Sequence, residues 1–250
     1  MIEILPLFGM PEIVPGAALA RLLAEAATPL RPFRKCDVLV VTQKIISKAE
    51  GAYVDLESVT PGTEALALAQ ATGKEAGLVE MVLRESIAVV RAVPNVLITR
   101  HRSGHVMANA GIDRSNLGMN DGHRALLLPA DADASATKLR HDPTWGTDQP
   151  PAIVISDSFG RPWRLGVVNV AIGADGLPAL LDRRGEPDRD GRPLEVTEIA
   201  FADMIATAAG LVMGEGAEGV PAALVRGLAW NGSSRPAATL VRPLEQDLFR

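Results

Sequence analysis

Residues 37–51, DVLVVTQKIISKAEG, form the stretch that decides the fold. The first part, Asp37 to Thr42, is a continuous run of apolar and mostly β-branched residues, which is typical of a strand buried on both faces. Two more such runs, AIVIS at 152–156 and GVVNVAI at 166–172, predict further buried strands. Helical segments lie between the strands without regular βαβ repeats. The sequence therefore predicts an α+β fold with mixed sheets and packed helices rather than a doubly wound sheet.

Outward from these strands, Gly and Pro boundaries and apolar spacing predict the remaining elements. We expect strands at 2–7, 95–99, 105–108 and 220–226, and helices at 15–27, 61–71, 74–90, 131–140 and 194–213. Residues 182–192 are predicted to form a charged loop. The polar segment 141–151, which holds three prolines, is predicted to be a linker or surface loop. We interpret residues 1–250 as one domain built as two lobes.

The composition narrows the class of protein. Hydrophobic residues make up 47% of the 250 residues, which suits a compact globular chain. A formal net charge of −5 gives no general attraction to nucleic acid or anionic lipid, so neither is expected as a partner. Cys36 is the only cysteine, which excludes an intrachain disulfide and a zinc site with several cysteine ligands. Because the sequence has no signal peptide and no apolar stretch long enough for a bilayer, we expect a cytoplasmic protein.

Three segments place acidic side chains in loops beside apolar elements, where they are held rigidly but reach solvent. They are NAGIDRSN at 109–116 with Asp113, SDSFGRPWR at 156–164 with Asp157, and MGEGAEGVP at 213–221 with Glu215. Carboxylates are the hard ligands that Mg²⁺ or Mn²⁺ takes, and Arg161 and Arg164 add positive charge for phosphate or coenzyme. Each segment alone is also compatible with an ordinary turn or cap.

The glycines of the third segment, Gly214, Gly216 and Gly219, literally fit the dinucleotide-binding pattern G-x-G-x-x-G. We reject that interpretation, because the motif follows a predicted helix and leads into a strand, the reverse of the dinucleotide fold. What remains is a flexible backbone that can bring N–H groups and a carboxylate close to a ligand. The alternative is a glycine-rich helix end followed by a turn.

Lys44 and Lys48 follow the first buried strand and are four residues apart, so one helical turn places both on one face. Two neighbouring ammonium groups suit a shared phosphate, and the alternative is a solvated basic face. No G-x-x-x-x-G-K-[ST] pattern occurs, so a nucleotide would not bind in a P-loop.

The histidines argue against a histidine-based hydrolase. His101 and His105 are four apart, but Ser103-Gly104 between them predicts a hairpin turn rather than a helix. Neither a Ser-His-Asp order nor an H-E-x-x-H pattern occurs in the sequence.

Taken jointly, DVLVVTQKIISKAEG, NAGIDRSN, SDSFGRPWRLG and LVMGEGAEGVPAALVRGL resemble the coenzyme F420:L-glutamate ligase family, the gamma-glutamyl ligases of a deazaflavin coenzyme. Order and spacing match from the loop at 7–11 to Arg226. The resemblance implies a family-specific α+β fold and an intertwined homodimer. It also implies a GTP-dependent addition of L-glutamate to the carboxylate of the precursor F420-0, then of another glutamate through a γ-linkage. An amide ligase of this kind first converts the carboxylate to an acyl phosphate.

Carried over position by position, the resemblance implies a metal site and a GTP site. The metal positions are Asp113, Asp157, Ser158 and Glu215, for two Mg²⁺ or Mn²⁺ ions, with a monovalent K⁺ as a further candidate. The GTP positions are Met10, Pro11, Gln43, Lys44, Lys48, Asn116, Met213, Gly214, Glu215, Gly216, Ala217, Glu218, Gly219 and Val220. No side-chain nucleophile is expected. Metal ions bound at Asp113 and Asp157 are expected to assist the reaction instead.

Two positions depart from the family pattern. Ser158 stands where the family usually has Thr, although the hydroxyl remains, and Gln43-Lys44 stands where small hydroxyl residues also occur. Some relatives carry a C-terminal reductase-like domain, which we do not expect in this chain. Two other functions use the same residues: a metal-dependent phosphohydrolase with water as acceptor, and a nucleotide-sensing module that binds GTP without turnover.

Overall fold

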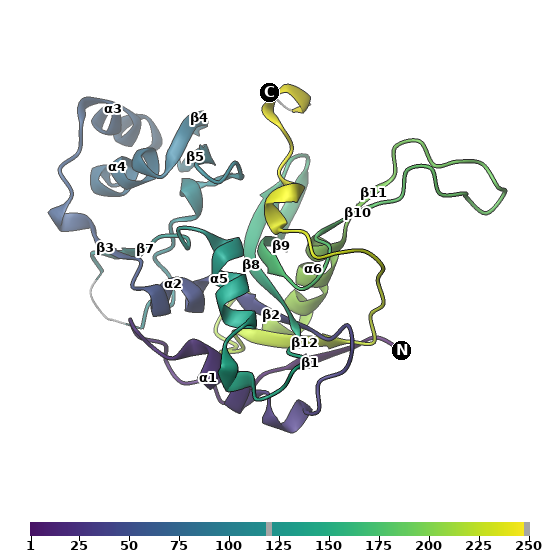
Figure 1. Ribbon diagram of the computed structural model, residues 1–250. Helices are drawn as coiled ribbons and strands as arrows, with labels where there is room; N and C mark the ends of the chain where they lie inside the picture. Colours follow the sequence, from purple (N-terminus) through teal and green to yellow (C-terminus); the bar gives the residue numbers. More distant parts are fainter. Residues whose placement is uncertain (119–121, 248–250) are drawn as a thin grey trace.

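The computed structural model describes residues 1–118 and 122–247. Its centre is a five-stranded sheet (Figure 1) with the strand order β1-β12-β2-β8-β9. These strands are β1 (Glu3–Pro6), β12 (Ala222–Arg226), β2 (Val38–Thr42), β8 (Ala152–Arg161) and β9 (Arg164–Asp175). Only β2 and β8 pair in parallel, and the other neighbours are antiparallel. The mixed sheet confirms the predicted α+β class.

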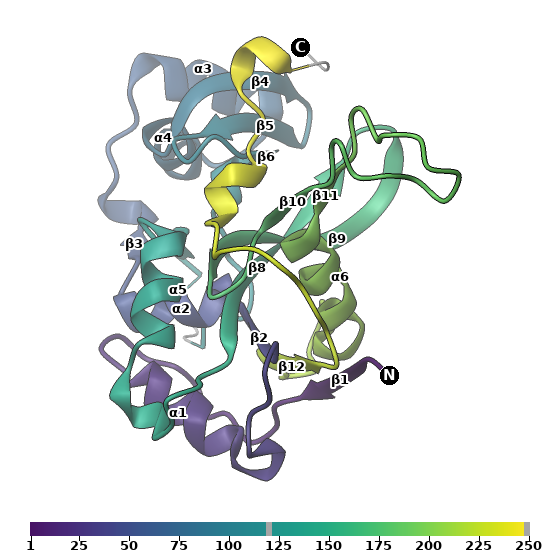
Figure 2. The ribbon, with the colours of Figure 1, turned by 45° about the vertical axis from the view of Figure 1, so that its right-hand side comes forward.

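β2 lies in the middle of the sheet because its side chains are apolar on both faces. Leu39 and Val41 pack on one side with α1 (Leu19–Ala26) and α5 (Ala132–Arg140). Val38 and Val40 pack on the other side with α6 (Phe201–Met213). Figure 2 shows α1 and α5 on one face of the sheet and α6 on the other. The side chains of Val38 to Val41 are fully buried, as the continuous apolar run predicts.

A buried ion pair fixes the register of the sheet at one end. The Arg226 guanidinium at the end of β12 donates to Asp37, just before β2, with a shortest N–O distance of 2.7 Å. Its terminal nitrogen also donates to the backbone carbonyl of Leu30 at 2.8 Å. The Asp37 side chain raises the pKa of Arg226 further above its ordinary value. Both partners are buried, so each depends on the other for charge compensation.

The remaining elements pack mostly around a third apolar cluster. It contains side chains of α3 (Thr63–Thr72), α4 (Ala76–Arg84), β4 (Ser86–Val93) and β5 (Val96–His101), and β6 (Val106–Ala108) pairs with β5 to complete a three-stranded sheet. Two-stranded sheets join β3 (Tyr53–Asp55) to β7 (Arg124–Leu126) and β10 (Leu180–Asp182) to β11 (Glu198–Ala200). α2 (Gln43–Glu50) follows β2 directly. The two-lobe organisation and the homodimer stay predictions.

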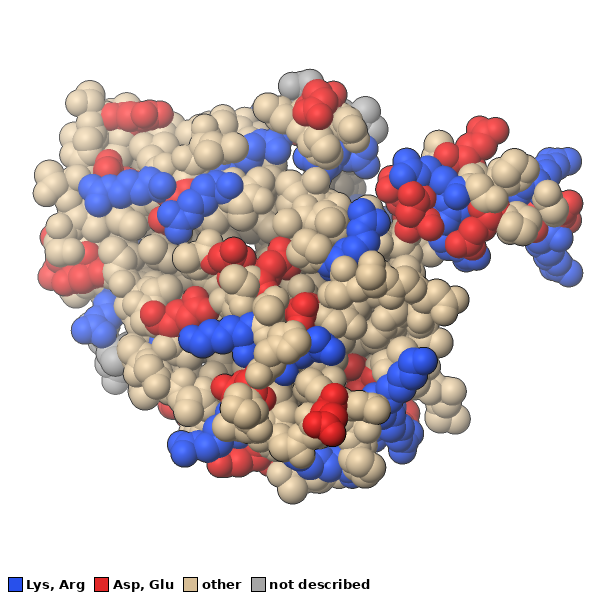
Figure 3. All heavy atoms as spheres, viewed as in Figure 1, with Lys and Arg blue, Asp and Glu red and all other residues tan. Residues whose placement is uncertain are grey.

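The hairpin between β10 and β11 projects from the body of the protein (Figure 1). Backbone hydrogen bonds such as Gly185 N–H to the Leu194 carbonyl, at 2.8 Å, hold its two arms together. Charged side chains of both signs crowd along it in Figure 3. The predicted charged loop is therefore confirmed, as part of a longer hairpin.

Several predicted boundaries are wrong. The helix predicted at 74–90 ends at Arg84, because the β-branched residues of 86–93 pair with β5 instead. The helix predicted at 194–213 begins only at Phe201, since residues 198–200 pair with β10. Segment 141–151 is not a simple linker, because a short helical turn places the Trp145 side chain in the core. The Trp145 indole N–H donates to the Leu139 carbonyl at 2.8 Å.

The hairpin turn predicted between His101 and His105 is confirmed. The His101 N–H donates to the His105 carbonyl at 2.8 Å, and Gly104 takes a positive φ of 91°. Among the described residues, no helix is both long and apolar enough to cross a membrane.

Candidate functional site

A cavity of about 640 Å³ lies where the carboxyl end of β2 and the middle of β8 meet the loop after α6. Every predicted metal and GTP position lines it: Met10, Pro11, Gln43, Lys44, Lys48, Asp113, Asn116, Asp157, Ser158 and the whole loop from Met213 to Val220. Arg161 and Arg164 do not line the cavity, since they lie at the tip of the β8–β9 hairpin. The structure thus brings together residues that are up to 210 positions apart in the sequence.

The parallel pairing of β2 and β8 explains why two of these segments meet. Thr42 lies opposite Ser156 in the register, so Gln43 and Asp157 follow at the same edge of the sheet. Asp157 was predicted in a loop, but β8 continues through it to Arg161. An irregularity in the β8–β9 register immediately precedes it, between Ile155 and Ser156.

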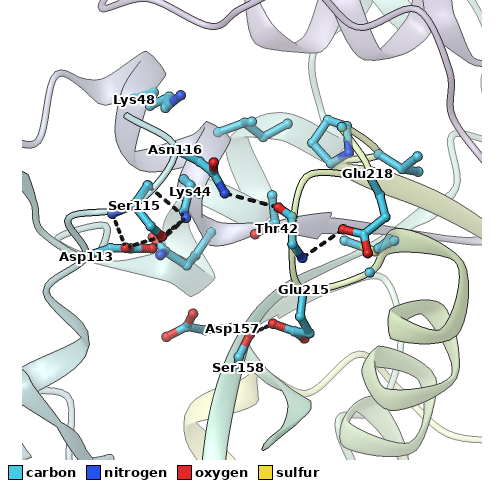
Figure 4. Close-up of a pocket in the computed structure, with 18 of the residues that line it drawn as sticks. Thr42, Lys44, Lys48, Asp113, Ser115, Asn116, Asp157, Ser158, Glu215 and Glu218 are labelled. Atoms are coloured by element: carbon cyan, nitrogen blue, oxygen red, sulfur yellow. Dashed lines mark hydrogen bonds and ion pairs between the residues drawn. The ribbon is translucent and has the colours of Figure 1, made fainter. Parts of the chain in front are cut away.

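Asp113 is held in place by backbone and side-chain contacts. Its backbone pairs with Leu126 at the end of β7, with N–O distances of 2.8 and 2.9 Å. Its Oδ1 accepts hydrogen bonds from the Ser115 N–H and the Ser115 hydroxyl, each at 2.8 Å. Its Oδ2 forms an ion pair with Lys44 Nζ at 2.6 Å (Figure 4). Burial alone would raise the pKa of Asp113, but the bonds from Lys44 and Ser115 outweigh it and lower the pKa.

Asp157 has the opposite electrostatic environment. Burial raises its pKa to about 7, and the nearby carboxylates of Asp113 and Glu215 add to the rise. The Ser158 N–H and the Lys44 ammonium oppose this increase without cancelling it. Next to Asp157, the Ser158 hydroxyl donates to Glu215 Oε2 at 2.5 Å. The positive charge near Asp157 is therefore too small to offset its burial and the neighbouring carboxylates.

The donor set fits a divalent cation. Asp157, Glu215 and Ser158 offer carboxylate and hydroxyl oxygens, the ligands that Mg²⁺ and Mn²⁺ take, and a cation would relieve the raised pKa of Asp157. In the arrangement that the structure describes, no three His, Cys, Asp or Glu side chains are close enough together to hold a metal ion. The two-ion metal site thus stays a prediction.

The loop from Gly214 to Gly219 is ordered by its own carboxylate. Glu218 Oε2 accepts a hydrogen bond from the Gly216 N–H at 2.7 Å. Asn116 Nδ2 donates to the Gly216 carbonyl at 3.2 Å and joins two loops across the cavity. Gly214 has φ 73° and ψ 178°, a region that only glycine adopts easily, and a Cβ there would meet the Glu218 carboxylate at 2.2 Å. The loop follows α6 and leads into β12, which agrees with rejecting the dinucleotide motif.

The two lysines of α2 bind different carboxylates in this structure. Lys44 contacts Asp113, whereas the buried Lys48 ammonium forms an ion pair with Glu12. Sequence reasoning missed Glu12, although it directly follows the predicted Met10-Pro11 contact. Ser115 and Asn169 also line the cavity and were not predicted there. Asn169 was not predictable from a motif, because it reaches the cavity from β9 by pairing with Ser158.

Comparisons with known proteins agree with this geometry. Residues 8–227 match the family described as F420-0:Gamma-glutamyl ligase. The chain is 42% identical to the coenzyme F420:L-glutamate ligase of Methanothermobacter thermautotrophicus, over 100% of this chain and 99% of that protein. The proteins of the same name from Methanopyrus kandleri and Archaeoglobus fulgidus are 42% and 41% identical, over 96% and 100% of this chain and 94% and 96% of their own lengths.

The fold, the acidic cavity and these full-length matches define an enzyme of the ligase class. The matches cover nearly all of the described structure, including each segment that lines the cavity. The chain belongs to the F420-0:gamma-glutamyl ligase family.

Proposed function

We propose that this chain is a GTP-dependent ligase of coenzyme F420 biosynthesis. It adds L-glutamate to the carboxylate of the precursor F420-0 and extends the product with a second glutamate through a γ-linkage. The observation that carries the proposal is the single cavity in which all the family's metal and nucleotide positions converge. The names of the relatives, coenzyme F420:L-glutamate ligase, support the substrate pair.

The charge of the cavity supports the need for a divalent cation. Among the described residues, five carboxylates line it, those of Glu12, Asp113, Asp157, Glu215 and Glu218, against two ammonium groups. A triphosphate entering this surplus of negative charge would be repelled. Bound at Asp157, Glu215 and Ser158, with Asp113 beside them, Mg²⁺ or Mn²⁺ would neutralise the triphosphate and polarise its terminal phosphorus. A monovalent K⁺ stays a further candidate ligand of the same cavity.

The residues of the chain itself position the reactants. Lys48 can exchange the Glu12 carboxylate for a phosphate oxygen, and residues 214–219 line the same space. An oxygen of the precursor carboxylate attacks the γ-phosphorus and GDP leaves with the bonding electron pair. The glutamate amine then attacks the acyl carbon, phosphate leaves, and the amine proton goes to solvent. Such transfers depend on positioning and electrostatics, which agrees with a site without a side-chain nucleophile.

The exposed tip of the β8–β9 hairpin supports the homodimer. Trp163, Leu165 and Val167 are 88%, 98% and 51% exposed there, an apolar group that a second copy of the chain would cover. Light scattering on the purified protein tests this: the expected mass is twice that of one chain. A monomer at micromolar concentration would contradict the proposed assembly.

One incubation tests the activity. The protein is mixed with F420-0, GTP, Mg²⁺ or Mn²⁺ and L-glutamate, and the products are read by mass spectrometry. We expect a glutamate added to the precursor and GDP released only when glutamate is present. Phosphate release that ignores glutamate would instead support a phosphohydrolase, and tight GTP binding without turnover would support a sensing module. The Asp148→Asn variant, exposed and outside the cavity, serves as the control.

A further inference from the structure

The ammonium group of Lys44 is surrounded by oxygen atoms that accept its hydrogen bonds. Its Nζ lies 2.6 Å from Asp113 Oδ2, 3.1 Å from the Ser115 carbonyl oxygen and 3.1 Å from the Ser115 hydroxyl oxygen (Figure 4). An ammonium has three N–H donors, and three acceptors surround this one. The Ser115 hydroxyl donates a hydrogen bond to Asp113 Oδ1 at 2.8 Å, so the ring of hydrogen bonds is closed.

This arrangement is the oxygen coordination of a cation. A carboxylate, a carbonyl and a hydroxyl oxygen are the ligand types that bind metal ions in proteins. Here the positive centre is the ammonium group of a side chain. Lys44 is the second residue of α2, and its side chain is only 19% exposed. In the described contacts, all three of its donors are used, so none is left over for a phosphate.

The ammonium also changes what Asp113 can bind. With Oδ1 taken by Ser115 and Oδ2 by Lys44, the carboxylate has hydrogen-bond partners on both oxygens. A metal ion ~2.2 Å from Oδ2 would lie within about 5 Å of the Lys44 nitrogen, where two positive centres repel strongly. Asp113 pairs with Lys44 and Glu12 pairs with Lys48, which leaves three carboxylates. Glu218 accepts a hydrogen bond from the Gly216 N–H, so the two charges beside Ser158 are those of Asp157 and Glu215. One divalent cation balances them.

We propose that Lys44 is the resident second cation of this site, so that the chain binds one divalent ion, at Asp157, Glu215 and Ser158, in place of two. The inference rests on the proposed function for the presence of a metal and a nucleotide. It assigns Lys44 a positioning role: it keeps Asp113 and the 113–116 loop in place and supplies fixed positive charge, without a metal ion at that carboxylate.

Counting bound Mn²⁺ tests the proposal without turnover. The chain is saturated with a non-hydrolysable GTP analogue and titrated with Mn²⁺, and free Mn²⁺ is measured by electron paramagnetic resonance. We expect about one bound ion per wild-type chain. Lys44→Ser, which removes the ammonium and leaves an oxygen, should bind about two. Lys44→Arg keeps the charge and should bind about one.

Two results would overturn the inference: two ions on the wild-type chain, or one ion on both Lys44→Ser and the wild type. Thermal unfolding of each variant shows whether it is folded, and if Lys44→Ser is not, the wild-type count alone decides. The ligation assay is run separately. Two bound ions with normal ligation would refute this inference and leave the proposed function standing, whereas one bound ion without ligation would refute the function alone.

Discussion

We expect that replacing the Asp157 carboxylate with a neutral side chain stabilises the fold and abolishes activity. In the metal-free chain, burial and two neighbouring carboxylates raise its pKa from 3.8 to about 7. The folded state therefore keeps a proton that the unfolded chain releases above pH ~4. The corresponding stability is fully present below that pH and is lost as the pH rises through 7.

The size of this effect follows from the change in pKa. For a group removed completely from water, the loss between pH ~4 and ~7 would be about 4 kcal/mol. Because the Asp157 side chain is partly exposed, solvent screening reduces our expectation to roughly 2 to 3 kcal/mol. Asp157→Asn cannot ionise, so its free energy of unfolding should not fall over this range. At pH 8 the variant should be more stable than the wild type by that amount.

The assay is urea unfolding followed by circular dichroism from pH 5 to 8, in the presence of a chelator. Ligation by the same variant should fall by about a thousandfold, the equivalent of ~4 kcal/mol of transition-state stabilisation. Asp148→Asn, at an exposed position, is the matched control and should follow the wild type in both measurements. Parallel pH profiles for Asp157→Asn and the wild type would refute the buried-charge reasoning, and near-normal ligation would remove Asp157 from the mechanism.

Two further substitutions test other parts of the structure. Arg226→Met leaves the buried Asp37 carboxylate without its partner and should lower the free energy of unfolding by about 3 to 5 kcal/mol, measured by urea unfolding. Arg184→Met breaks an exposed pair and should change it little, and equal effects would contradict the role of burial. Gly214→Ala forces a side chain into a glycine-only conformation against Glu218, so affinity for a GTP analogue in calorimetry should fall at least about tenfold. Gly216→Ala has room for its methyl group and should weaken binding less; the reverse order would refute the argument.

The sequence was sufficient for the elements whose character is set locally. The runs at 37–42 and 152–156 are apolar on both faces, and a strand in the interior of a sheet buries both faces. Both runs form interior strands of the central sheet. Residues 86–90 were misassigned to a helix because their apolar spacing continues that of α4. Their strand conformation depends on pairing with β5, an interaction between segments that periodicity within one segment does not report.

The same distinction applies to the candidate site. Asp113, Asp157 and Glu215 could be selected because motifs surround them, and the structure places all three at one cavity. The partners of the lysines could not be selected. Lys44 and Asp113 are brought together by the contact between α2 and β7, and Glu12 reaches Lys48 from the loop after β1. Such pairs follow from the path of the chain, which no local pattern encodes.

The span of the cavity along the chain has a consequence for folding. Its walls come from the loop at Met10, the start of α2, the middle of β8 and the loop that ends at Val220. These segments meet only when the central sheet is complete, so contacts of high sequence separation must form before the cavity exists. A fragment or partly folded chain therefore has no binding site. Any ligand of the cavity is then a probe of global unfolding: it stabilises the whole fold in proportion to the logarithm of its concentration.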